Sequence, residues 1–425
     1  MLYEQIIAQL FQMSPSTLSA FSIEKAHILN RALHFPANSY PTIHIAGSNG
    51  KGSVSTKIAK TLELSGYRVG LYTSPHLFSF RERITVNGQQ IPEEAVVEGM
   101  QKMFLLEREL QNSRPLQNRP FDATFFELTT FLALEYFRQM GVDVAVIETG
   151  LGGRLDATNV INPILSVITS VSREHCQILG EDLEQIAAEK AGIIKPNTPV
   201  VIGPKARFQS IYNRAKELHS PLFACDDVGG HFYDEENSAI AALALEHLTS
   251  HFNLETAVSK FNLTSEAIKQ GLAIRPPCRF ERVGEAIFDV AHNPDAISHL
   301  IQALHTFFPL RKFRFLVGFS KDKEYDRCLA LIATIATHIH LVQANSPRSA
   351  TTEELICKGR ECCHLPSRTA VSRIIKDPFF FTPHISVKEG MKEAYSLALK
   401  NQEMLVVCGS FYIMADIRLL CHLKI

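Results

Sequence analysis

The chain has 425 residues, of which 46% are hydrophobic and 20% are charged, as in soluble globular proteins of about two or three domains. Its formal net charge of -1 gives no reason to expect a nucleic-acid or an anionic-membrane partner. No apolar run reaches the roughly 18 residues that a membrane-spanning helix needs. The N-terminal segment MLYEQIIAQLFQM resembles an amphipathic helix rather than a secretion signal. The nine cysteines include no C-x-x-C pair, so we expect free thiols in a reducing cytoplasm.

Short β-branched runs alternate with helical patterns along the first part of the chain. Strands are predicted at 41–47, 67–74, 142–149, 164–171 and 198–203, and helices at 53–65 and 125–140. Continuous apolar strands separated by helices indicate a parallel sheet that is covered on both faces.

This pattern breaks at 271–285, where Pro276 and Pro277 favour an extended linker. Strand–helix alternation then restarts, with strands predicted at 286–292, 313–319, 338–344 and 403–410 and helices after Pro294 and from about Glu324. We therefore expect two α/β domains, residues 1–275 and a smaller domain of residues 276–425.

A glycine-rich loop, AGSNGKGS at 46–53, joins the first predicted strand to a helix. Its glycines (Gly47, Gly50 and Gly52) allow backbone N–H groups to turn inward around phosphate oxygens. Lys51 would neutralise the β- and γ-phosphates of a nucleotide, and Ser53 would offer its hydroxyl to Mg²⁺. A tight turn without a ligand is the alternative, but the lysine and serine beside the glycines favour a phosphate site.

Other polar residues also follow predicted strands. Glu148 ends a strand of the buried type, where ligands collect in open α/β sheets, and its carboxylate is suited to Mg²⁺. His175 follows another strand, although a histidine there is more often structural than a metal ligand. Asp289 and His292 lie where a strand meets a helix. A helix cap would explain the adjacent Asn293 and Pro294 but not Asp289 and His292, for which a ligand contact stays open. Because lysines in helices are usually exposed to solvent, we expect Lys190 in its predicted helix to be exposed.

Several motifs resemble, in order and spacing, those of folylpolyglutamate synthases and dihydrofolate synthases, which belong to the Mur-ligase superfamily of ATP-dependent amide-forming enzymes. These motifs are AGSNGKGS, GLYTSPHL, RERI, ETGLGGRLDATN, AEKAGI, PPCRFE, DVAHNP and VVCGSFY. The resemblance runs from about residue 40 to 415. LGGRLDATN together with TSPHL is specific to the folate branch rather than to the cell-wall ligases.

The resemblance implies a phosphate-loop domain with a parallel sheet, which binds ATP and folate, and a smaller Rossmann-like α/β domain for glutamate ligation. ATP would phosphorylate a carboxylate of dihydropteroate or of a reduced folate, and the amine of L-glutamate would attack the acyl phosphate. Whether the protein uses one or both acceptors stays open at this point. A monomer is the default of the family.

The same resemblance assigns roles to single residues. Ser53 and Glu148 would hold one Mg²⁺, and His175 would help to hold a second, which Lys190 would contact as a carbamate formed with CO₂. The catalytic residues would be Lys51, His175, Lys190 and Arg279. The ATP contacts would be Gly47, Asn49, Gly50, Lys51, Gly52, Ser53, Asn237, Arg279, Asp289 and His292. The substrate contacts would be Ser74, Arg154, Asp156, His292 and Ser410.

Two positions depart from the family pattern, and two other functions compete. Glu174 stands where the family commonly has Asp before His175, and Cys278 stands where a small residue, often Gly, precedes the linker arginine. One competing function is a cell-wall amino-acid ligase that acts on a UDP-linked sugar, against which LGGRLDATN argues. The other is a phosphate-loop switch protein, which would give no role to DVAHNP or to Glu148 and His175 together.

Overall fold

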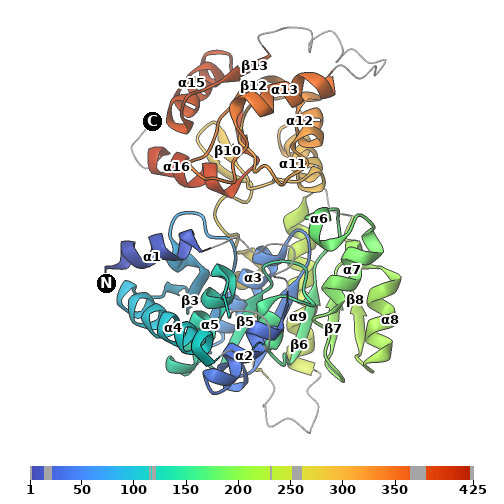
Figure 1. The fold of residues 1–425 in the computed structure, drawn as a ribbon. Coiled ribbons are helices and arrows are strands. Elements are labelled where there is room, and N and C mark those ends of the chain that lie inside the picture. The colour runs from blue at the N-terminus through green and yellow to red at the C-terminus, as the bar shows by residue number, and fades with distance from the viewer. Residues whose placement is uncertain are drawn as a thin grey trace. The chain divides into compact units, whose positions relative to one another are not determined.

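The computed structural model describes residues 2–13, 22–113, 116, 121–229, 232–250, 261–363 and 380–421. The chain divides into two compact units, the first formed by Met1–Gly229 and Asp234–Arg275, the second by Gly230–Tyr233 and Pro276–Ile425. Figure 1 colours the first unit from blue to yellow-green and most of the second from yellow to red. Each unit is an α/β structure around its own sheet, and the expected fold class is confirmed.

The described strands of the first unit form one sheet in the order β4-β3-β2-β5-β1-β6-β7-β8. Strands β2, β5, β1, β6, β7 and β8 run parallel, and β3 and β4 are antiparallel additions at one edge. All residues of β1, β5 and β6 are buried, which explains their continuous apolar sequences. The bounds are β1 Thr42–Ala46, β2 Val69–Tyr72, β3 Ile84–Val86, β4 Gln89–Gln90, β5 Val144–Glu148, β6 Leu165–Ile168, β7 Val200–Ile202 and β8 Leu222–Ala224.

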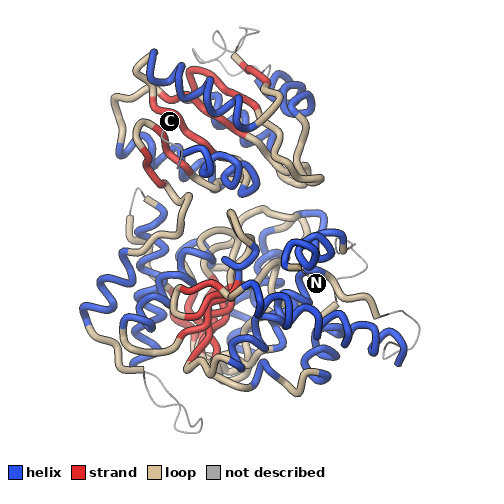
Figure 2. Tube along the Cα trace, turned by 90° about the vertical axis from the view of Figure 1, so that its left-hand side faces the viewer, coloured by secondary structure: helices blue, strands red, loops and turns tan. Residues whose placement is uncertain are grey.

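Helices cover both faces of this sheet, and Figure 2 shows the red strands between them. Ala145 and Ile147 of β5 pack with α1, α2, α4 and α5, whereas Val144 and Val146 pack with α3, α9 and α10 on the opposite face. Helices α7 and α8 pack against β6 and β7. The bounds are α1 Tyr3–Gln12, α2 Glu24–Ala32, α3 Lys51–Leu64, α4 Glu93–Ser113, α5 Phe125–Gln139, α6 Cys176–Leu179, α7 Leu183–Ala191, α8 Gln209–Glu217, α9 Tyr233–Ser250 and α10 Ser265–Ala273, with short 3₁₀ turns η2 Pro36–Asn38, η3 Phe80–Arg83, η4 Ala157–Val160 and η5 Pro204–Ala206.

Local sequence signals explain where two of these helices begin. Thr124 caps α5: its hydroxyl accepts from the Glu127 N–H at 3.2 Å, and the Glu127 carboxylate accepts from the Thr124 N–H at 2.7 Å. Helix α3 begins at Lys51, two residues before the predicted start at Ser53, because the left-handed Gly50 directly precedes it. The expected N-terminal amphipathic helix is α1, with Ile6 and Leu10 buried.

The second unit has a sheet in the order β13-β12-β11-β14-β10-β9, which is parallel except for the β9–β10 pair. Its core joins this sheet to α11 and α12. The bounds are β9 Glu281–Val283, β10 Ala286–Phe288, β11 Phe313–Val317, β12 Ala336–Leu341, β13 Phe381–Pro383, β14 Met404–Cys408, α11 Pro294–Phe307, α12 Tyr325–Ala333, α13 Thr352–Cys363, α15 Val387–Lys400 and α16 Phe411–Cys421.

Two whole-chain expectations concern cysteines and membranes. Six cysteines are free thiols, namely Cys176, Cys225, Cys278, Cys328, Cys357 and Cys408, and the other three side chains lie outside the described part. Of the helices that the structure describes, none has both the length and the apolar character needed to cross a membrane.

Candidate active site

The glycine-rich loop connects β1 to α3 at the carboxyl edge of the parallel sheet. Gly47 has φ +151°, and a Cβ there would lie 1.9 Å from Thr169 Oγ1. Gly50 has φ +88°, and a Cβ there would collide with the side chain of a residue in α9. Only glycine fits at both positions. The Lys51 ammonium donates to the carbonyls of Gly47 at 2.8 Å and Ser48 at 3.2 Å, so it lies against the loop.

The segment after β6 holds the loop from the neighbouring strand. Thr169 Oγ1 and Ser170 Oγ donate to the Asn49 carbonyl at 2.6 and 3.0 Å. The Ser48 N–H donates to the Ser170 carbonyl at 2.8 Å. Since β6 pairs directly with β1, the loop backbone is fixed in place. A fixed loop can present its N–H groups to an anion without reorganising.

Glu148 ends β5, which pairs with β1 on its other side. The side chain is buried, and Glu148 Oε2 accepts from the Ser74 N–H at 3.0 Å. A Cβ at Gly52 would lie 3.6 and 3.9 Å from the two carboxylate oxygens. The glycine between Lys51 and Ser53 therefore keeps side-chain atoms away from this carboxylate.

Ser53 and Glu148 offer the oxygen ligands that Mg²⁺ prefers. Both residues are buried, and Ser53 lies in the first turn of α3, next to Gly52. Within the described residues, no three His, Cys, Asp or Glu side chains form a ready-made metal site. Mg²⁺ usually takes only one or two carboxylates and completes its shell with water and phosphate oxygens. The residues present therefore fit a divalent cation bound beside a nucleotide.

Lys190 of α7 is fully buried, so the expectation from residue physics that it is exposed was wrong. Its Nζ donates to Glu174 Oε1 at 2.5 Å, and the Glu174 side chain is only 8% exposed. The helix turns this lysine inward because Ile186, Ala187 and Ala191 on α7 belong to the core. The pair is a buried ion pair rather than a solvated surface contact.

The electrostatics of this pair involve the phosphate loop. Burial lowers the pKa of Lys190, the nearby Lys51 lowers it further, and Glu174 opposes both. Burial tends to raise the pKa of Glu174, but the charges of Lys190, Lys51 and His175 outweigh it and hold that pKa well below its usual range. Lys190 and Glu174 therefore lie in the electrostatic field of the loop lysine.

His175 directly follows Glu174 and precedes α6. It adopts a left-handed backbone with φ +47°, which is uncommon for a residue other than glycine. Its predicted role as a metal ligand stays a prediction. The departure at Glu174 has a clear consequence, because this longer acid is the partner of Lys190.

The loop after β5 is shaped by Asp156. Its Oδ2 accepts from the N–H groups of residues 150–151 at 3.0 and 2.8 Å, and its Oδ1 accepts from the N–H and hydroxyl of Thr158 at 3.0 and 2.5 Å. Arg154, in the same loop, pairs with Glu189 at 2.8 Å and is 55% exposed. The structure thus gives Asp156 and Arg154 structural partners, and their substrate contacts stay predictions.

In the second unit, Asp289 follows β10 and is buried. Its Oδ1 accepts from the Ala291 N–H at 2.8 Å, and its Oδ2 accepts from the Phe280 N–H at 2.8 Å and from the Tyr233 hydroxyl. Burial raises the pKa of Asp289, whereas Tyr233 and Arg279 oppose the rise. One carboxylate thereby joins three separate segments of this unit.

Arg279, His292 and Ser410 lie around Phe411 at the start of α16. The Arg279 guanidinium lies 5.1 Å from the centre of the Phe411 ring, and the His292 ring lies 5.7 Å from it. Ser410 is buried and accepts a backbone N–H from α16. Cys278 has φ +56°, so the residue before Arg279 adopts a conformation that favours glycine.

The structure brings the phosphate loop and Glu148 together in the first unit, and it places Arg279, His292 and Ser410 around Phe411 in the second. Arg154 instead pairs with Glu189. Asn237 lies beside the phosphate loop, since its Oδ1 would lie 2.3 Å from a Cβ at Gly50. Sequence reasoning missed Glu174 as the partner of Lys190, and it missed Thr169 and Ser170 as supports of the loop. The polar end of the predicted strand at 164–171 was the one signal for the latter pair.

Two family models cover most of the chain. The Mur ligase middle domain matches residues 45–267, and the Mur ligase, glutamate ligase domain matches residues 278–411. The folylpolyglutamate synthase of Lacticaseibacillus casei is 32% identical over 421 residues, which cover 92% of each chain. The chain belongs to the folylpolyglutamate synthase family. A second member, the dihydrofolate synthase/folylpolyglutamate synthase of Bacillus subtilis, is 31% identical over 91% of each chain.

Solved structures of folylpolyglutamate synthases and dihydrofolate synthases share the fold. FolC of Escherichia coli, in complex with DHPP and ADP, has a TM-score of 0.81 and 26% identity, covering 100% of this chain and 98% of the other. A bifunctional folylpolyglutamate synthase/dihydrofolate synthase with Mn, AMPPNP and L-glutamate bound has a TM-score of 0.80 and 27% identity, covering 99% and 98%. The family likeness thus extends over both units.

Proposed function

We propose that this protein is an ATP-dependent ligase that joins L-glutamate to a carboxylate of dihydropteroate or of a folyl(poly)glutamate through an acyl phosphate. The observation that carries the proposal is the phosphate loop with the Glu148 carboxylate beside Gly52, in a chain that a folylpolyglutamate synthase matches over 92% of its length. The loop supplies the means to bind ATP, and the family supplies the reaction.

The reaction explains why a cationic loop is needed. A carboxylate is a poor electrophile because its leaving group would be oxide, and phosphorylation by ATP provides a better leaving group. The acceptor carboxylate and the nucleotide are both anions, so positive charge must offset their repulsion. Lys51 at the loop provides such charge in the first unit, and Arg279 is our candidate for the same task in the second.

Nucleotide and cation are supported by the solved relatives. One carries ADP, and another carries AMPPNP with Mn. We assign the first Mg²⁺ to Ser53 and Glu148, and a second to His175 and Lys190. When bound, these cations would offset phosphate charge during transfer.

A carbamate on Lys190 would suit the second cation. CO₂ reacts with a neutral amine, and burial together with Lys51 lowers the pKa of Lys190 toward that form. The carbamate is anionic and offers two oxygens, which are suitable ligands for Mg²⁺. Glu174 would then need the cation as its counter-ion in place of the lysine ammonium.

Two relatives support the inclusion of both dihydropteroate and folates as acceptors. The Bacillus subtilis relative is named for dihydrofolate synthesis and for folylpolyglutamate synthesis. The Escherichia coli relative was solved with DHPP and ADP. We infer that this chain also accepts both classes of substrate, acts as a monomer and works in the cytoplasm.

The comparisons argue against both competing functions. A cell-wall ligase acting on a UDP-linked sugar is not favoured, because the relatives matched over about nine-tenths of the chain are folylpolyglutamate and dihydrofolate synthases. A switch protein needs no glutamate-ligase domain, yet residues 278–411 match one.

Phosphate release measured with a panel of acceptors tests the proposal. The purified chain with ATP, Mg²⁺ and L-glutamate should release phosphate with dihydropteroate or a reduced folate and not with UDP-linked muramyl substrates. Release that requires the UDP-linked acceptor would establish the cell-wall alternative. Release that needs neither an acceptor nor glutamate would point to the switch protein.

A further inference from the structure

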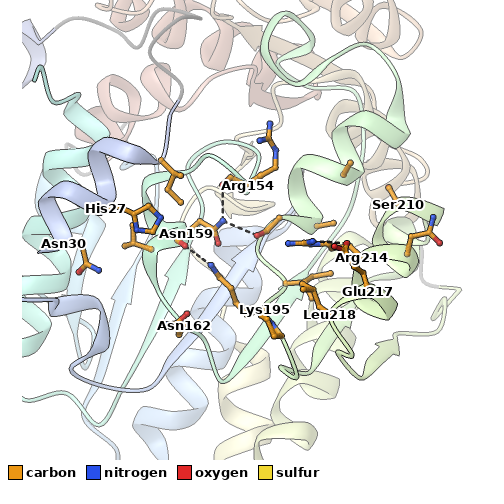
Figure 3. Close-up of a pocket in the computed structure, with 18 of the residues that line it drawn as sticks. His27, Asn30, Arg154, Asn159, Asn162, Lys195, Ser210, Arg214, Glu217 and Leu218 are labelled. Carbon is orange, nitrogen blue, oxygen red and sulfur yellow. Dashed lines mark hydrogen bonds and ion pairs between the residues drawn. The ribbon is translucent and has the colours of Figure 1, made fainter. Parts of the chain in front are cut away.

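A cavity of about 830 Å³ lies in the first unit, away from the phosphate loop. Its walls come from α2, from the loop at 154–162, from α7 with the segment after it, and from α8 (Figure 3). Gly47–Ser53, Glu148, Glu174 and Lys190 are not among its lining residues. Its volume lies within the range of roughly 300–1,000 Å³ that is usual for sites of small organic ligands.

The charges of the lining are unequal. Arg154 pairs with Glu189 at 2.8 Å, and Arg214 pairs with Glu217 at 2.9 Å. Lys195 has no carboxylate partner among the described residues, and its Nζ donates to the Asn159 carbonyl at 2.8 Å. Figure 3 shows this bond and the arginines around the same cavity. One positive charge of the lining therefore remains uncompensated.

The surroundings of Lys195 increase the need for a counter-ion. Burial and, to a smaller extent, the neighbouring Arg214 lower its pKa to about 8. At neutral pH the ammonium form still predominates, in a half-buried place beside a second cation. A bound anion would relieve both the desolvation and the repulsion.

Apart from His27, the rest of the lining has no ionisable side chain. It combines the carboxamides of Asn30, Asn38, Asn159, Asn162 and Asn213 with apolar side chains from Ile23, Phe35, Val160, Ile194 and Leu218. Apolar walls favour a ligand with a hydrocarbon or ring body, and carboxamides orient it without adding charge.

We propose that this cavity is a second ligand site, distinct from the phosphate loop, for a small organic anion with a carboxylate on an apolar body. Lys195 is the counter-ion of the carboxylate, and the apolar side chains from α2, α8 and the segment after α7 contact the body. An occupant would also touch α7 through Ala188 and Ala191, the helix that carries Lys190.

The test uses 2-naphthoate and its neutral analogue 2-naphthamide as probes, with calorimetric titration of the full chain in the absence of nucleotide. We expect 2-naphthoate to bind at least about 10-fold more tightly than 2-naphthamide, because only the former offers an anion to Lys195. Lys195→Gln should remove this difference, although glutamine can still donate to the Asn159 carbonyl. Lys216→Gln, on the exposed side of α8, is the matched control and should keep it.

Two further variants test the charge of the lining and the independence of this cavity from the phosphate loop. Asn162→Asp adds a negative charge to the lining at an exposed position and should weaken 2-naphthoate binding but not 2-naphthamide binding. Lys51→Ala should bind 2-naphthoate as tightly as the unmodified chain even though it loses ligase activity, which separates this site from the proposed reaction. Equal affinities of the two probes, or an unchanged preference in Lys195→Gln, would overturn the proposal.

Discussion

At the scale of single residues, Glu148 is a buried carboxylate beside the phosphate loop. Its Oε2 accepts the Ser74 N–H, and Gly52 places no side-chain atoms against it. Glu148→Gln keeps the shape and removes the charge, so we expect the Mg²⁺ concentration needed for half-maximal activity to rise at least about 10-fold. The melting temperature should change little, because glutamine can still accept the same N–H.

Mg²⁺ titrations of activity for Glu148→Gln and for the exposed control Glu98→Gln measure this effect. An unaltered Mg²⁺ requirement in Glu148→Gln would mean that the residue is structural. The control should behave as the unmodified protein, since Glu98 lies on the exposed side of α4.

A structural and a catalytic role of Lys190 can be distinguished by whether an added carboxylic acid restores the activity of a Lys190 variant. Lys190→Ala leaves Glu174 buried without its cation, so a loss of stability would accompany either role. We expect it to be nearly inactive and to recover part of its activity with added acetate or propionate, which would occupy the vacated space as an anion. Lys190→Arg should not be rescued, because a guanidinium fills the space with the wrong charge.

Initial rates of the two variants over a range of acetate concentrations provide the measurement. Ordinary activity in Lys190→Ala would show that the lysine serves only to pair with Glu174. Equal rescue of Lys190→Arg would contradict the carbamate, because the arginine leaves no place for the acid.

At the scale of elements, Lys57 joins the phosphate-loop helix α3 to the end of α10. Its Nζ donates to the carbonyls of Leu272 at 2.6 Å and Ile274 at 2.9 Å, and it lies 3.1 Å from Asp234. A cation at the C-terminal end of a helix satisfies carbonyls that have no partner within the helix. Lys57 therefore fixes the last residues of the first unit to the helix that begins with Lys51.

Lys57→Met keeps the apolar stem and removes the charge. Because it removes the hydrogen bonds to the Leu272 and Ile274 carbonyls and the ion pair with Asp234, we expect the free energy of unfolding of the first unit to fall by about 1–3 kcal/mol. Lys60→Met, one turn along the same helix and 33% exposed, should cost less than about 0.5 kcal/mol. Urea denaturation of both variants measures the difference, and equal losses would show that the Lys57 contacts do not stabilise the unit.

In the second unit, a row of side chains links β11, β12 and the end of β13. Arg314 donates to His340 Nε2 at 3.0 Å, so the proton of the neutral ring lies on Nδ1 and is donated to His384 Nε2 at 2.7 Å. Burial, together with smaller effects of the nearby His338, His384 and Arg314, lowers the pKa of His340 to about 3. His340 is therefore neutral in the folded protein at pH values where it is charged after unfolding.

This depressed pKa has a definite sign for stability. Above the ordinary pKa of about 6.5 both states are neutral and the stability is complete, whereas below it only the unfolded state gains a proton, so stability is lost as the pH falls toward 3. Between pH 7.5 and 5.5, His340 should contribute a loss of about 1.4 kcal/mol. Urea midpoints of His340→Gln should show a correspondingly smaller pH dependence, and an unchanged dependence would contradict the assigned cause.

At the scale of the whole molecule, the sequence predicts most of the architecture and only part of the site. The loop at Gly47–Ser53 and the strand ending at Glu148 are local patterns, so the alternation of strands and helices was enough to find them. The burial of Lys190 depends on which face of α7 meets the core, and residue physics predicted the opposite. Glu174 could not be recognised as its partner, because their contact joins segments that are distant in sequence.

The order of strands explains what local patterns could not. Because β1 lies between β5 and β6, Glu148, the phosphate loop and the Thr169–Ser170 pair come together at one edge of the sheet. Local sequence patterns did not give this neighbourhood, although the family resemblance had already placed Ser53 and Glu148 on one Mg²⁺. The family resemblance supplied Arg279 of the second unit, which no local pattern singled out, and it gave roles to Asp289 and His292, for which the local pattern left a ligand contact undecided.

Mass spectrometry of the products tests the central claim most directly. The purified chain is incubated with ATP, Mg²⁺, L-glutamate and, separately, dihydropteroate or a reduced folate. We expect each acceptor to gain the mass of one or more glutamyl residues, only when ATP and glutamate are both present, together with ADP and phosphate. ATP hydrolysis without any glutamylated product from either acceptor would contradict the assignment of this chain as a folate-type glutamate ligase.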